Sequence, residues 1–148
     1  MIKKFKISVI TVCLNSERTI ERCIKSIINQ KYDKSKIEHI IIDGKSRDST
    51  VKIIKKYKTK ITYWESKKDK GIYHAMNKGI RKAKGDIIGI LNADDFYYKN
   101  TFKIVNKYFI NKKIDYLFGS INHKKIYHSF YPEKIWYKLN VVPSHSVS

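Results

Sequence analysis

Residues 69–95 read DKGIYHAMNKGIRKAKGDIIGILNADD and contain both kinds of element that decide the fold. The first part carries apolar residues at the spacing of an amphipathic helix, with Gly85 as its stop signal. Those apolar residues are Ile72, Met76, Ile80 and Ala83. The run DIIGIL at 86–91 is almost wholly apolar, which is typical of a strand buried on both faces. A helix followed by a buried strand is the repeating unit of an α/β fold.

The same alternation extends toward the N-terminus. Further strand-like runs, apolar and rich in β-branched residues, lie at 7–14, 37–43 and 61–66. Helical stripes follow the first two runs, formed by Ile20, Cys23, Ile24, Ile27 and Ile28 and by Val51, Ile54 and Tyr57. The expected caps are Asn15 or Ser16 for the first helix and Asp48 or Ser49 for the second. The pattern predicts βαβ units and an α/β fold, with a mostly parallel sheet flanked by helices.

Beyond residue 100 the pattern is weaker. The stretch 101–110 predicts a helix, and two short strands at 115–121 and 124–130 are expected to pair in antiparallel fashion. The core-facing residues of the helix would be Phe102, Val105, Tyr108 and Phe109. Because the 148 residues show no repeat and no linker, one domain is expected over 1–148.

The chain is strongly basic, with a formal net charge of +19. Such a charge attracts nucleic acid, phosphorylated molecules or acidic lipid, although a Lys-, Ile- and Asn-rich composition also follows from AT-rich coding. Cys13 and Cys23 lack the spacing of zinc ligands or of a disulfide framework. No run approaches the roughly 20 apolar residues that cross a bilayer, and no signal peptide is evident. A cytoplasmic location is therefore expected.

Polar clusters follow all four predicted strands. The carboxyl ends of parallel strands lie at one edge of a sheet, where ligands bind, so these clusters are expected to line one crevice. In the last cluster, Asp94 and Asp95 would repel each other unless a cation lay beside them. Carboxylate oxygens suit Mg²⁺ or Mn²⁺, which often bridge to substrate phosphates. The competing interpretation is a pair of aspartates that caps the next turn.

Three segments, TVCLNSE, IIIDGKSRDST and residues 69–95, occur in this order and together closely resemble the family 2 glycosyltransferases of bacterial polysaccharide synthesis. The resemblance covers roughly residues 7–100. It implies a GT-A fold in which 7–100 binds a nucleotide-diphosphate sugar, typically a UDP-sugar. It also implies inverting, metal-assisted transfer of the sugar to a saccharide or lipid-linked acceptor.

The resemblance assigns the residues around the base. Thr11, Cys13 and Asn15 match the loop that surrounds it, and Glu17 matches the acidic residue beside it. Asp43 matches the aspartate that hydrogen-bonds the base, and the alternative for this residue is a loop cap at the end of a strand.

Further matches lie around the third helix. Asp69, Lys70 and Gly71 match a turn in which the lysine meets phosphate and the glycine allows close backbone approach. Tyr73 and Asn77 share one face of the helix, and a solvated surface is the alternative for both.

Asp94 and Asp95 match the DXD-like element of the family, in which one carboxylate faces the ribose and the last one reaches the metal. The resemblance thus implies a ribose contact for Asp94 and a metal site formed by Asp95 with Asp94, holding Mn²⁺ or Mg²⁺. This ion would neutralise the diphosphate leaving group.

Three positions depart from the family pattern. Lys45 stands where a glycine or small residue is frequent, and His74 and Asn92 stand where acidic residues are frequent. His74 is expected to be a surface residue rather than a base, because no partner for it is evident.

Family members usually continue into an acceptor-binding half that supplies the general base. Glu133 is the only carboxylate after Asp115, and VPSHSVS, with His145, resembles the lead into that half. The chain is therefore expected to be a donor-binding core followed by the start of the acceptor half at 101–148. On this interpretation it is truncated before a general base that lies beyond Ser148.

Other functions stay open. A basic surface could rest on an anionic membrane at the inner face of the plasma membrane, which is compatible with the glycosyltransferase interpretation. The chain could also be a non-catalytic nucleotide-sugar-binding fragment. Aromatics among the lysines of 96–116 and 123–139 could stack nucleic-acid bases, but nucleic acid is not expected as a partner, because several of these aromatics fall at core spacing.

Overall fold

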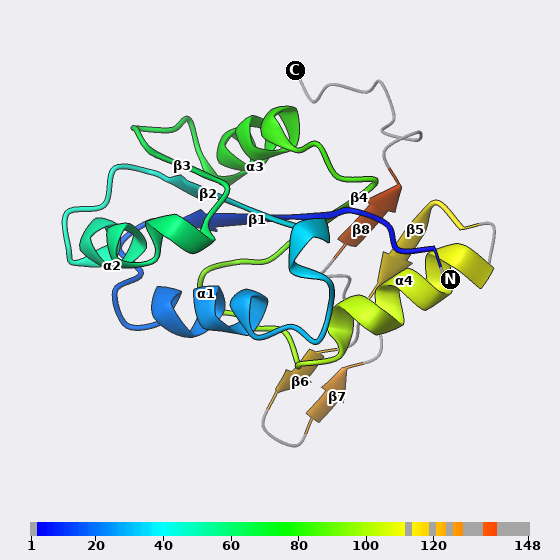
Figure 1. Ribbon diagram of the computed structural model, residues 1–148. Helices are drawn as coiled ribbons and strands as arrows, with labels where there is room; N and C mark the ends of the chain where they lie inside the picture. The colour runs from blue at the N-terminus through cyan, green and yellow to red at the C-terminus, as the bar shows by residue number, and fades with distance from the viewer. Residues whose placement is uncertain (1–2, 112–113, 119–120, 124–125, 129–134, 139–148) are drawn as a thin grey trace.

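The computed structural model describes residues 3–111, 114–118, 121–123, 126–128 and 135–138, with side chains described as far as Leu117. A six-stranded sheet in the order β3-β2-β1-β4-β8-β5 forms its centre (Figure 1). The strands of this sheet are β1 (Ile7–Cys13), β2 (Ile37–Asp43), β3 (Tyr63–Ser66), β4 (Ile87–Ile90), β5 (Tyr116–Phe118) and β8 (Ile135–Lys138). The helices are α1 (Ile20–Ile28), α2 (Thr50–Lys56), α3 (Ile72–Lys82) and α4 (Thr101–Asn111), with 3-10 turns η1 (Lys34–Lys36) and η2 (Lys58–Lys60).

The pairing of the strands confirms the predicted mostly parallel sheet. β1 runs parallel to both β2 and β4, and β2 runs parallel to β3. At the other side of β4, β8 pairs in antiparallel fashion with β4 and with β5. The four predicted βαβ strands therefore form the parallel part of the sheet.

Helices cover both faces of the parallel part, as Figure 1 shows, with α3 on one face and α1, α2 and α4 on the other. Alternate residues of β1 explain this arrangement. Ile7 and Val9 pack in one cluster with residues of α1 and α4, whereas Ile10 and Val12 pack with Ala75 of α3. Because all of β1 is buried, its sequence reads as a continuous apolar run rather than an alternating one.

The start of α1 differs from the prediction. The helix begins at Ile20 after Thr19, and no side chain caps it. The backbone carbonyl of Ser16 accepts hydrogen bonds from the N–H groups of Thr19 and Ile20 at 3.0 and 2.9 Å. Asn15 does not cap the helix, because the helix begins only at Ile20, and its side chain accepts from the N–H of Arg47 instead. For α2, Ser49 occupies the N-cap position but its side chain makes no capping bond, and the Asp48 side chain accepts from the N–H of Thr50 instead.

Two predicted features of α3 are wrong. Ile72, at the start of the helix, is half exposed, because it lines a cleft at the edge of the sheet instead of packing in the core cluster under α3. The helix ends at Lys82, before Gly85, which instead lies against β1. A Cβ on Gly85 would lie 2.7 Å from the backbone nitrogen of Ser8, so this glycine permits close packing rather than a helix stop.

The region after residue 100 shares the same core, because Phe102, Val105 and Phe109 of α4 pack with Ile7 of β1. Tyr108 was expected to join them and is 40% exposed. Asn106 takes a buried position instead, because its side chain accepts from the N–H of Phe5 at 2.9 Å. The boundary expected near residue 100, between a donor-binding core and an acceptor half, stays a prediction.

The strand predicted at 115–121 is divided between two sheets. β5 joins the main sheet beside β8, whereas β6 (Ile121–His123) pairs with β7 (Ile126–His128) in an antiparallel ladder. The expected antiparallel pairing therefore holds for β6 alone, because β8 supplies the partner for β5. His145 and Glu133 lie outside the described residues. Within the described ranges, no helix is long and apolar enough to span a membrane.

Candidate nucleotide-sugar site

A cleft of about 670 Å³ opens at the carboxyl ends of β1, β2 and β4. Residues from the loops after all four parallel strands line it, which confirms the predicted convergence of polar loops at one edge. The lining residues from the end of β1 and the first two loops are Val12, Cys13, Leu14, Asn15, Ser16, Glu17, Arg18, Thr19, Gly44 and Asp48. Those from the later loops and the start of α3 are Asp69, Gly71, Ile72, Ala75, Asn92, Ala93 and Asp94.

The loops after β1 and β2 are joined by hydrogen bonds that use two of the predicted site residues. Asn15 Oδ1 accepts from the N–H of Arg47 at 2.9 Å. Glu17 Oε2 accepts from the N–H of Ser49 at 2.9 Å, while the N–H of Glu17 donates to Asp48 at 3.1 Å. Asn15 and Glu17 therefore hold the shape of this wall of the cleft, and both also line it.

Two non-glycine residues in the loops after β1 and β2 have left-handed backbone conformations, Asn15 at φ 49° and Lys45 at φ 70°. Asparagine tolerates this region because its short polar side chain bonds locally, but lysine has no such compensation. Glycine would adopt the conformation of Lys45 without strain, which explains why a glycine or small residue suits this position.

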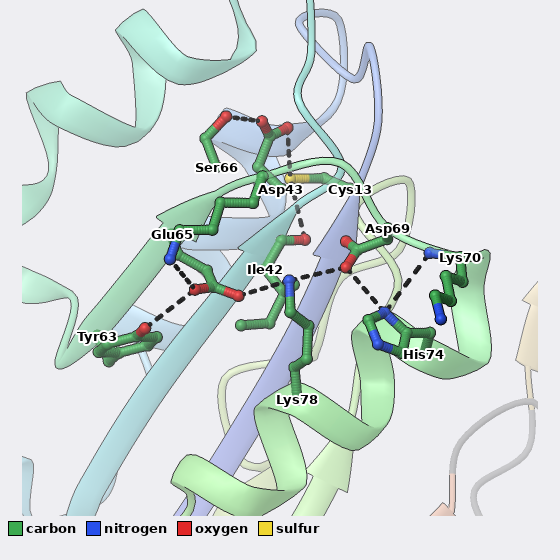
Figure 2. A network of polar contacts seen from close by, with 11 residues as sticks. Cys13, Ile42, Asp43, Tyr63, Glu65, Ser66, Asp69, Lys70, His74 and Lys78 are labelled. Carbon is green, nitrogen blue, oxygen red and sulfur yellow. Dashed lines mark hydrogen bonds and ion pairs between the residues drawn. The ribbon is translucent and has the colours of Figure 1, made fainter.

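Asp43, at the end of β2, lies beneath the cleft rather than in it. Its side chain has no exposed surface, and the residue is absent from the cleft lining. The carboxylate accepts from the hydroxyl of Ser66 at 2.6 Å (Figure 2). It also accepts from the N–H of Ser46 at 2.9 Å and from the Ser46 hydroxyl. In this arrangement Asp43 supports the loop after β2, and contact with a base would require one of these serines to move.

The two predicted residues on β1 differ in position. Thr11 is fully buried, and its hydroxyl lies 3.0 Å from Nε2 of His39. Cys13 lies at the edge of the cleft, and its thiol points to Asp43 Oδ1 at 3.5 Å. Burial, and then the negative charge of Asp43, raise the pKa of the Cys13 thiol far above its usual value. Cys13 is therefore a neutral thiol and not a nucleophile.

A chain of polar contacts connects β3 to α3 beside the cleft (Figure 2). Lys78 Nζ lies 2.7 Å from Glu65 Oε1 and 2.8 Å from Asp69 Oδ1. The hydrogen bond from Lys78 lowers the pKa of Glu65, and the bonds to Asp69 and then Glu65 raise the pKa of Lys78. The network fixes Asp69, whose side chain is only 7% exposed, at the cleft wall.

His74 also contacts this network, although the sequence indicated no pairing for it, and its side chain is 39% exposed on the helix. Its Nδ1 lies 3.2 Å from Asp69 Oδ1, because one turn of α3 brings the ring back over the preceding loop (Figure 2). The sequence separation of five residues gave no sign of this contact.

The other residues predicted around α3 are dispersed. Gly71 lines the cleft at φ 113° and ψ 173°, a conformation open only to glycine. Lys70 is exposed, Tyr73 is 76% exposed and Asn77 is half-buried, and none of the three lines the cleft. The structure therefore brings Asp69 and Gly71 to the site and leaves the other three outside its wall.

The acidic pair follows β4. Asp94 is exposed and lines the cleft, whereas Asp95 is half-buried and its N–H donates to the carbonyl of Asn92 at 3.0 Å. Arg22 of α1 contacts this loop, since its Nη2 donates to the carbonyl of Asp94 at 2.7 Å. Of the two metal-site candidates, Asp94 is thus the one on the cleft wall.

The acidic pair fits a hard divalent ion in part. Asp94 offers exposed carboxylate oxygens, the donor type that Mg²⁺ and Mn²⁺ prefer. Among the described residues, no group of three or more His, Cys, Asp or Glu side chains could hold a metal ion. A bound ion would therefore take its remaining ligands from water and from substrate phosphates.

Several residues of the site were not foreseen from the sequence. They are Ser46, Ser66 and Lys78, which hold Asp43 and Asp69, and Leu14 and Ile72, which expose apolar surface to the cleft. A serine in a loop or at a strand end and a lysine on a helix carry no local signal for such contacts. The left-handed position of Lys45 was the one feature that a departure from the family pattern indicated.

A mostly parallel α/β sheet, with a cleft lined by the loops at its carboxyl edge, is the arrangement of nucleotide-binding α/β proteins. Residues 8–144 match the family described as Glycosyl transferase family 2, and the chain belongs to that family. The α/β fold is that of the GT-A glycosyltransferases, as the solved structures below show.

Three similar proteins illustrate the likeness. An uncharacterized glycosyltransferase of Mycobacterium tuberculosis is 40% identical over 89 residues, which cover 60% of this chain and 34% of that protein. TarS of Staphylococcus aureus, a poly(ribitol-phosphate) β-N-acetylglucosaminyltransferase, is 30% identical over 101 residues, which cover 66% of this chain and 18% of TarS. The crystal structure of TarS 1-349 with UDP-GlcNAc has a TM-score of 0.72 at 25% identity and covers 82% of this chain and 36% of that one.

The third is a mannosyltransferase of Pyrobaculum calidifontis, in complex with GDP-Man and Mn²⁺. It has a TM-score of 0.76 at 19% identity and covers 92% of this chain and 45% of that one, a likeness that shows the fold alone. The chain spans about a third of the length of the first curated relatives that it matches.

Proposed function

We propose that this chain is the nucleotide-sugar-binding part of a glycosyltransferase. The enzyme would transfer a sugar from a UDP-sugar to a saccharide or lipid-linked acceptor in surface polysaccharide synthesis. The observation that carries the proposal is a cleft on whose wall Asp94 is exposed beside residues from the loops after all four parallel strands. The UDP-GlcNAc complex of TarS supports uracil as the base.

The base and ribose would occupy the wall formed by the loops after β1 and β2. Leu14 and Ile72 are 60% and 50% exposed and line the cleft, so they offer apolar surface to the flat ring of a base. Asn15 and Glu17 hold the wall in shape through the bonds between the two loops. Asp43 supports the same wall from below, through Ser46.

The diphosphate would lie toward the loop after β4. Asp94, with Asp95, would hold Mn²⁺ or Mg²⁺ there, and the bound ion would neutralise the negative charge of the departing nucleotide diphosphate. Gly71 would allow the backbone at the start of α3 to approach the ligand closely. Lys70, exposed on the same turn, would meet phosphate as a mobile point charge.

We propose a single displacement with inversion at the sugar carbon. An acceptor hydroxyl would attack that carbon while the bond to the diphosphate breaks, and a general base would take the hydroxyl proton. None of the residues that line the cleft is assigned this role. The chain would thus supply donor binding and leaving-group stabilisation.

Titration calorimetry with UDP, with and without Mn²⁺, tests the proposal. The wild-type chain should bind UDP at least about tenfold more tightly with Mn²⁺, a difference of roughly 1.4 kcal/mol. Asp94→Ala and Asp95→Ala should each remove most of this gain, and Asp95→Ala should leave the metal-free affinity unchanged.

Asp86→Ala is the matched control. Asp86 is also exposed and also flanks β4, but it lies at the opposite end of the strand, where it accepts from the N–H of Lys6. Equal affinity for UDP with and without Mn²⁺ would contradict the metal-assisted mechanism. An equal loss in the Asp86 variant would show that the effect comes from net charge.

The formal charge of +19 supports a cytoplasmic site of action, at the inner face of the plasma membrane, where lipid-linked acceptors reside. The chain should then sediment with vesicles that contain phosphatidylglycerol, and salt should weaken this binding, because it shortens the screening length from about 10 Å at 0.1 M to about 3 Å at 1 M. Failure to bind at low salt would remove this part of the proposal.

A further inference from the structure

One edge of helix α1 holds the segment that carries the acidic pair. Arg22, Ser26 and Gln30 are spaced by four residues, which places them above one another along one side of the helix and the residues after it. Each of them is hydrogen-bonded to main-chain atoms of the segment 94–102. This edge was not singled out by the apolar periodicity, because its residues are polar.

Two of the three residues, Ser26 and Gln30, make contacts that also belong to the interior of the fold. Gln30 is 2% exposed, and its amide donates to the carbonyl of Tyr98 at 2.8 Å and accepts from the N–H of Phe102 at 3.1 Å. The hydroxyl of Ser26 accepts from the N–H of Tyr97 at 3.1 Å. The N–H groups of Tyr97 and Phe102 belong to buried residues, so Ser26 and Gln30 serve the fold as well as the loop.

Arg22, near the start of α1, differs from Ser26 and Gln30 because it is exposed. Its Nη2 donates to the carbonyl of Asp94 at 2.7 Å, and its guanidinium lies 4.8 Å from the centre of the Phe96 ring. The two contacts lie on either side of Asp95. A planar guanidinium can bond a carbonyl and stack on a ring at the same time, which an ammonium does less well.

We propose that Arg22 is a positioning residue, which fixes the backbone of the acidic loop so that the carboxylates of Asp94 and Asp95 are held ready for a metal–diphosphate ligand. The inference rests on the proposed function, because it names what the two carboxylates are held for. Arg22 acts through the carbonyl of Asp94 and the ring of Phe96, so its own charge is not what binds the ligand.

The physical reason is the entropy of the loop. Ordering a backbone at the moment of binding weakens the affinity, and a loop that is already ordered avoids this loss. Arg22 is exposed and belongs to no core cluster, so its removal should loosen the loop without unfolding the chain. The matched control is Lys25, which is also exposed on α1 and also carries one positive charge, but pairs with Glu21.

Amide hydrogen exchange tests the positioning itself, without any ligand. In Arg22→Met, the Asp95 and Phe96 amides should exchange about fivefold faster, as expected from the loss of one hydrogen bond that orders the loop. Amides of β2 should keep their rates, and Lys25→Met should resemble the wild type throughout. Unchanged exchange at Asp95 and Phe96 would overturn the proposal.

Calorimetry then tests the link to the ligand. Arg22→Met should bind Mn²⁺–UDP about tenfold more weakly, an energy difference of roughly 1.4 kcal/mol, and should bind uridine without metal as the wild type does. A similar loss for uridine would overturn the proposal, because it would indicate general damage to the cleft. A loss for Mn²⁺–UDP that vanishes at about 1 M salt would also overturn it, because it would assign the effect to long-range charge.

The two measurements separate this inference from the proposed function. If the wild-type chain shows no metal-dependent binding of UDP, the proposed function fails, while the exchange rates still decide whether Arg22 orders the loop.

Discussion

At the amino-terminal end of the parallel sheet, the carboxylate of Glu38 is 3% exposed and fully engaged by the protein. It accepts from the hydroxyl of Ser8 and from the N–H of Lys84 at 2.7 Å, and it lies 3.5 Å from Nζ of Lys6. At the opposite end, Asp94 is exposed on the wall of a cleft of about 670 Å³.

The difference between the two ends comes from their loops. At the amino-terminal end, Gly85 brings the turn before β4 directly against Ser8, and its N–H donates to the Ser8 hydroxyl at 2.8 Å. At the carboxyl end, the loops after β1, β2 and β4 diverge and leave the cleft between them. Asp43 is intermediate, because it lies at the cleft end but is bonded as completely as Glu38. Buried carboxylates therefore shape the sheet ends, and exposed ones remain available to a ligand.

The largest expected effects compare Glu38 with Asp43. Glu38→Ala and Asp43→Ala should each lower the free energy of unfolding by about 3 kcal/mol, because each leaves several buried donors without an acceptor. Urea denaturation gives the stability, and calorimetry gives the affinity for UDP at a temperature where both variants are folded. Only Asp43→Ala should weaken UDP binding. If Glu38→Ala weakens it equally, the two ends of the sheet are not functionally distinct.

A smaller effect should follow from the glycines of the cleft. Gly71→Ala should cost about 2 kcal/mol of stability, because its backbone conformation is open to almost no other residue. Gly44→Ala is the matched control, since a Cβ there would lie 3.5 Å from Leu14, an ordinary contact. Thermal unfolding of both variants would measure the difference. Equal stability of the two would show that the turn before α3 adapts freely.

The pH dependence of stability probes the interior of β2, between its two ends. Burial lowers the pKa of His39 from 6.5 to about 3 in the folded chain, so the unfolded chain binds one more proton between these values. Stability should therefore be unaffected by His39 above about pH 6.5 and fall below it, by at most about 1.4 kcal/mol per pH unit.

Urea denaturation of the wild type and of His39→Gln between pH 7 and pH 4 would measure the contribution of His39 to the pH dependence of stability. The free energy of unfolding should fall less steeply with decreasing pH in the variant than in the wild type. The difference in stability between the two proteins should therefore become smaller. Parallel curves for the two proteins would contradict the assignment to His39.

The smallest effect is expected at Lys45 and has the opposite sign. Lys45→Gly should raise the stability by up to about 1 kcal/mol, because it relieves a left-handed lysine at φ 70°. Asn15→Gly, at φ 49°, is the comparison, and it should not stabilise, because Asn15 would lose its bond to Arg47. Thermal unfolding measures both. A destabilised Lys45→Gly would show that the lysine side chain contributes contacts that outweigh the strain.

The parts of the fold that could be predicted from sequence are those in which burial repeats along the chain. The strands at 7–14, 37–43 and 86–91 were found because a parallel sheet covered on both faces requires unbroken apolar runs. The misplaced Tyr108 and the unforeseen β8 lie where that repetition is short. Periodicity reports which residues face a core, and it does not report which strand becomes the neighbour of another.

Within the site, the order of strands and polar segments along the chain predicted which loops line the cleft, but it did not predict which side chains bond one another there. Asp43 accepts a hydrogen bond from Ser66, which lies 23 residues away in the sequence, and Arg22 donates to Asp94, which lies 72 residues away. Such bonds depend on how loops are placed once the sheet has formed, and no local pattern encodes that placement. The sequence therefore indicated Asp43 and Asp94 equally, although only Asp94 lies on the cleft wall.

The sequence by itself determined the α/β class, the parallel sheet and the edge at which polar loops gather, because continuous apolar runs and helical apolar stripes, separated by polar loops, set which segments are buried. The tertiary structure alone decided which carboxylates are hydrogen-bonded by donors of the protein itself and which stay exposed. Hydrogen bonding is directional and short in range. A carboxylate at a strand end is therefore bonded by the protein, or left exposed to a ligand, according to whether the tertiary structure brings donors from distant parts of the chain within a few ångströms of it.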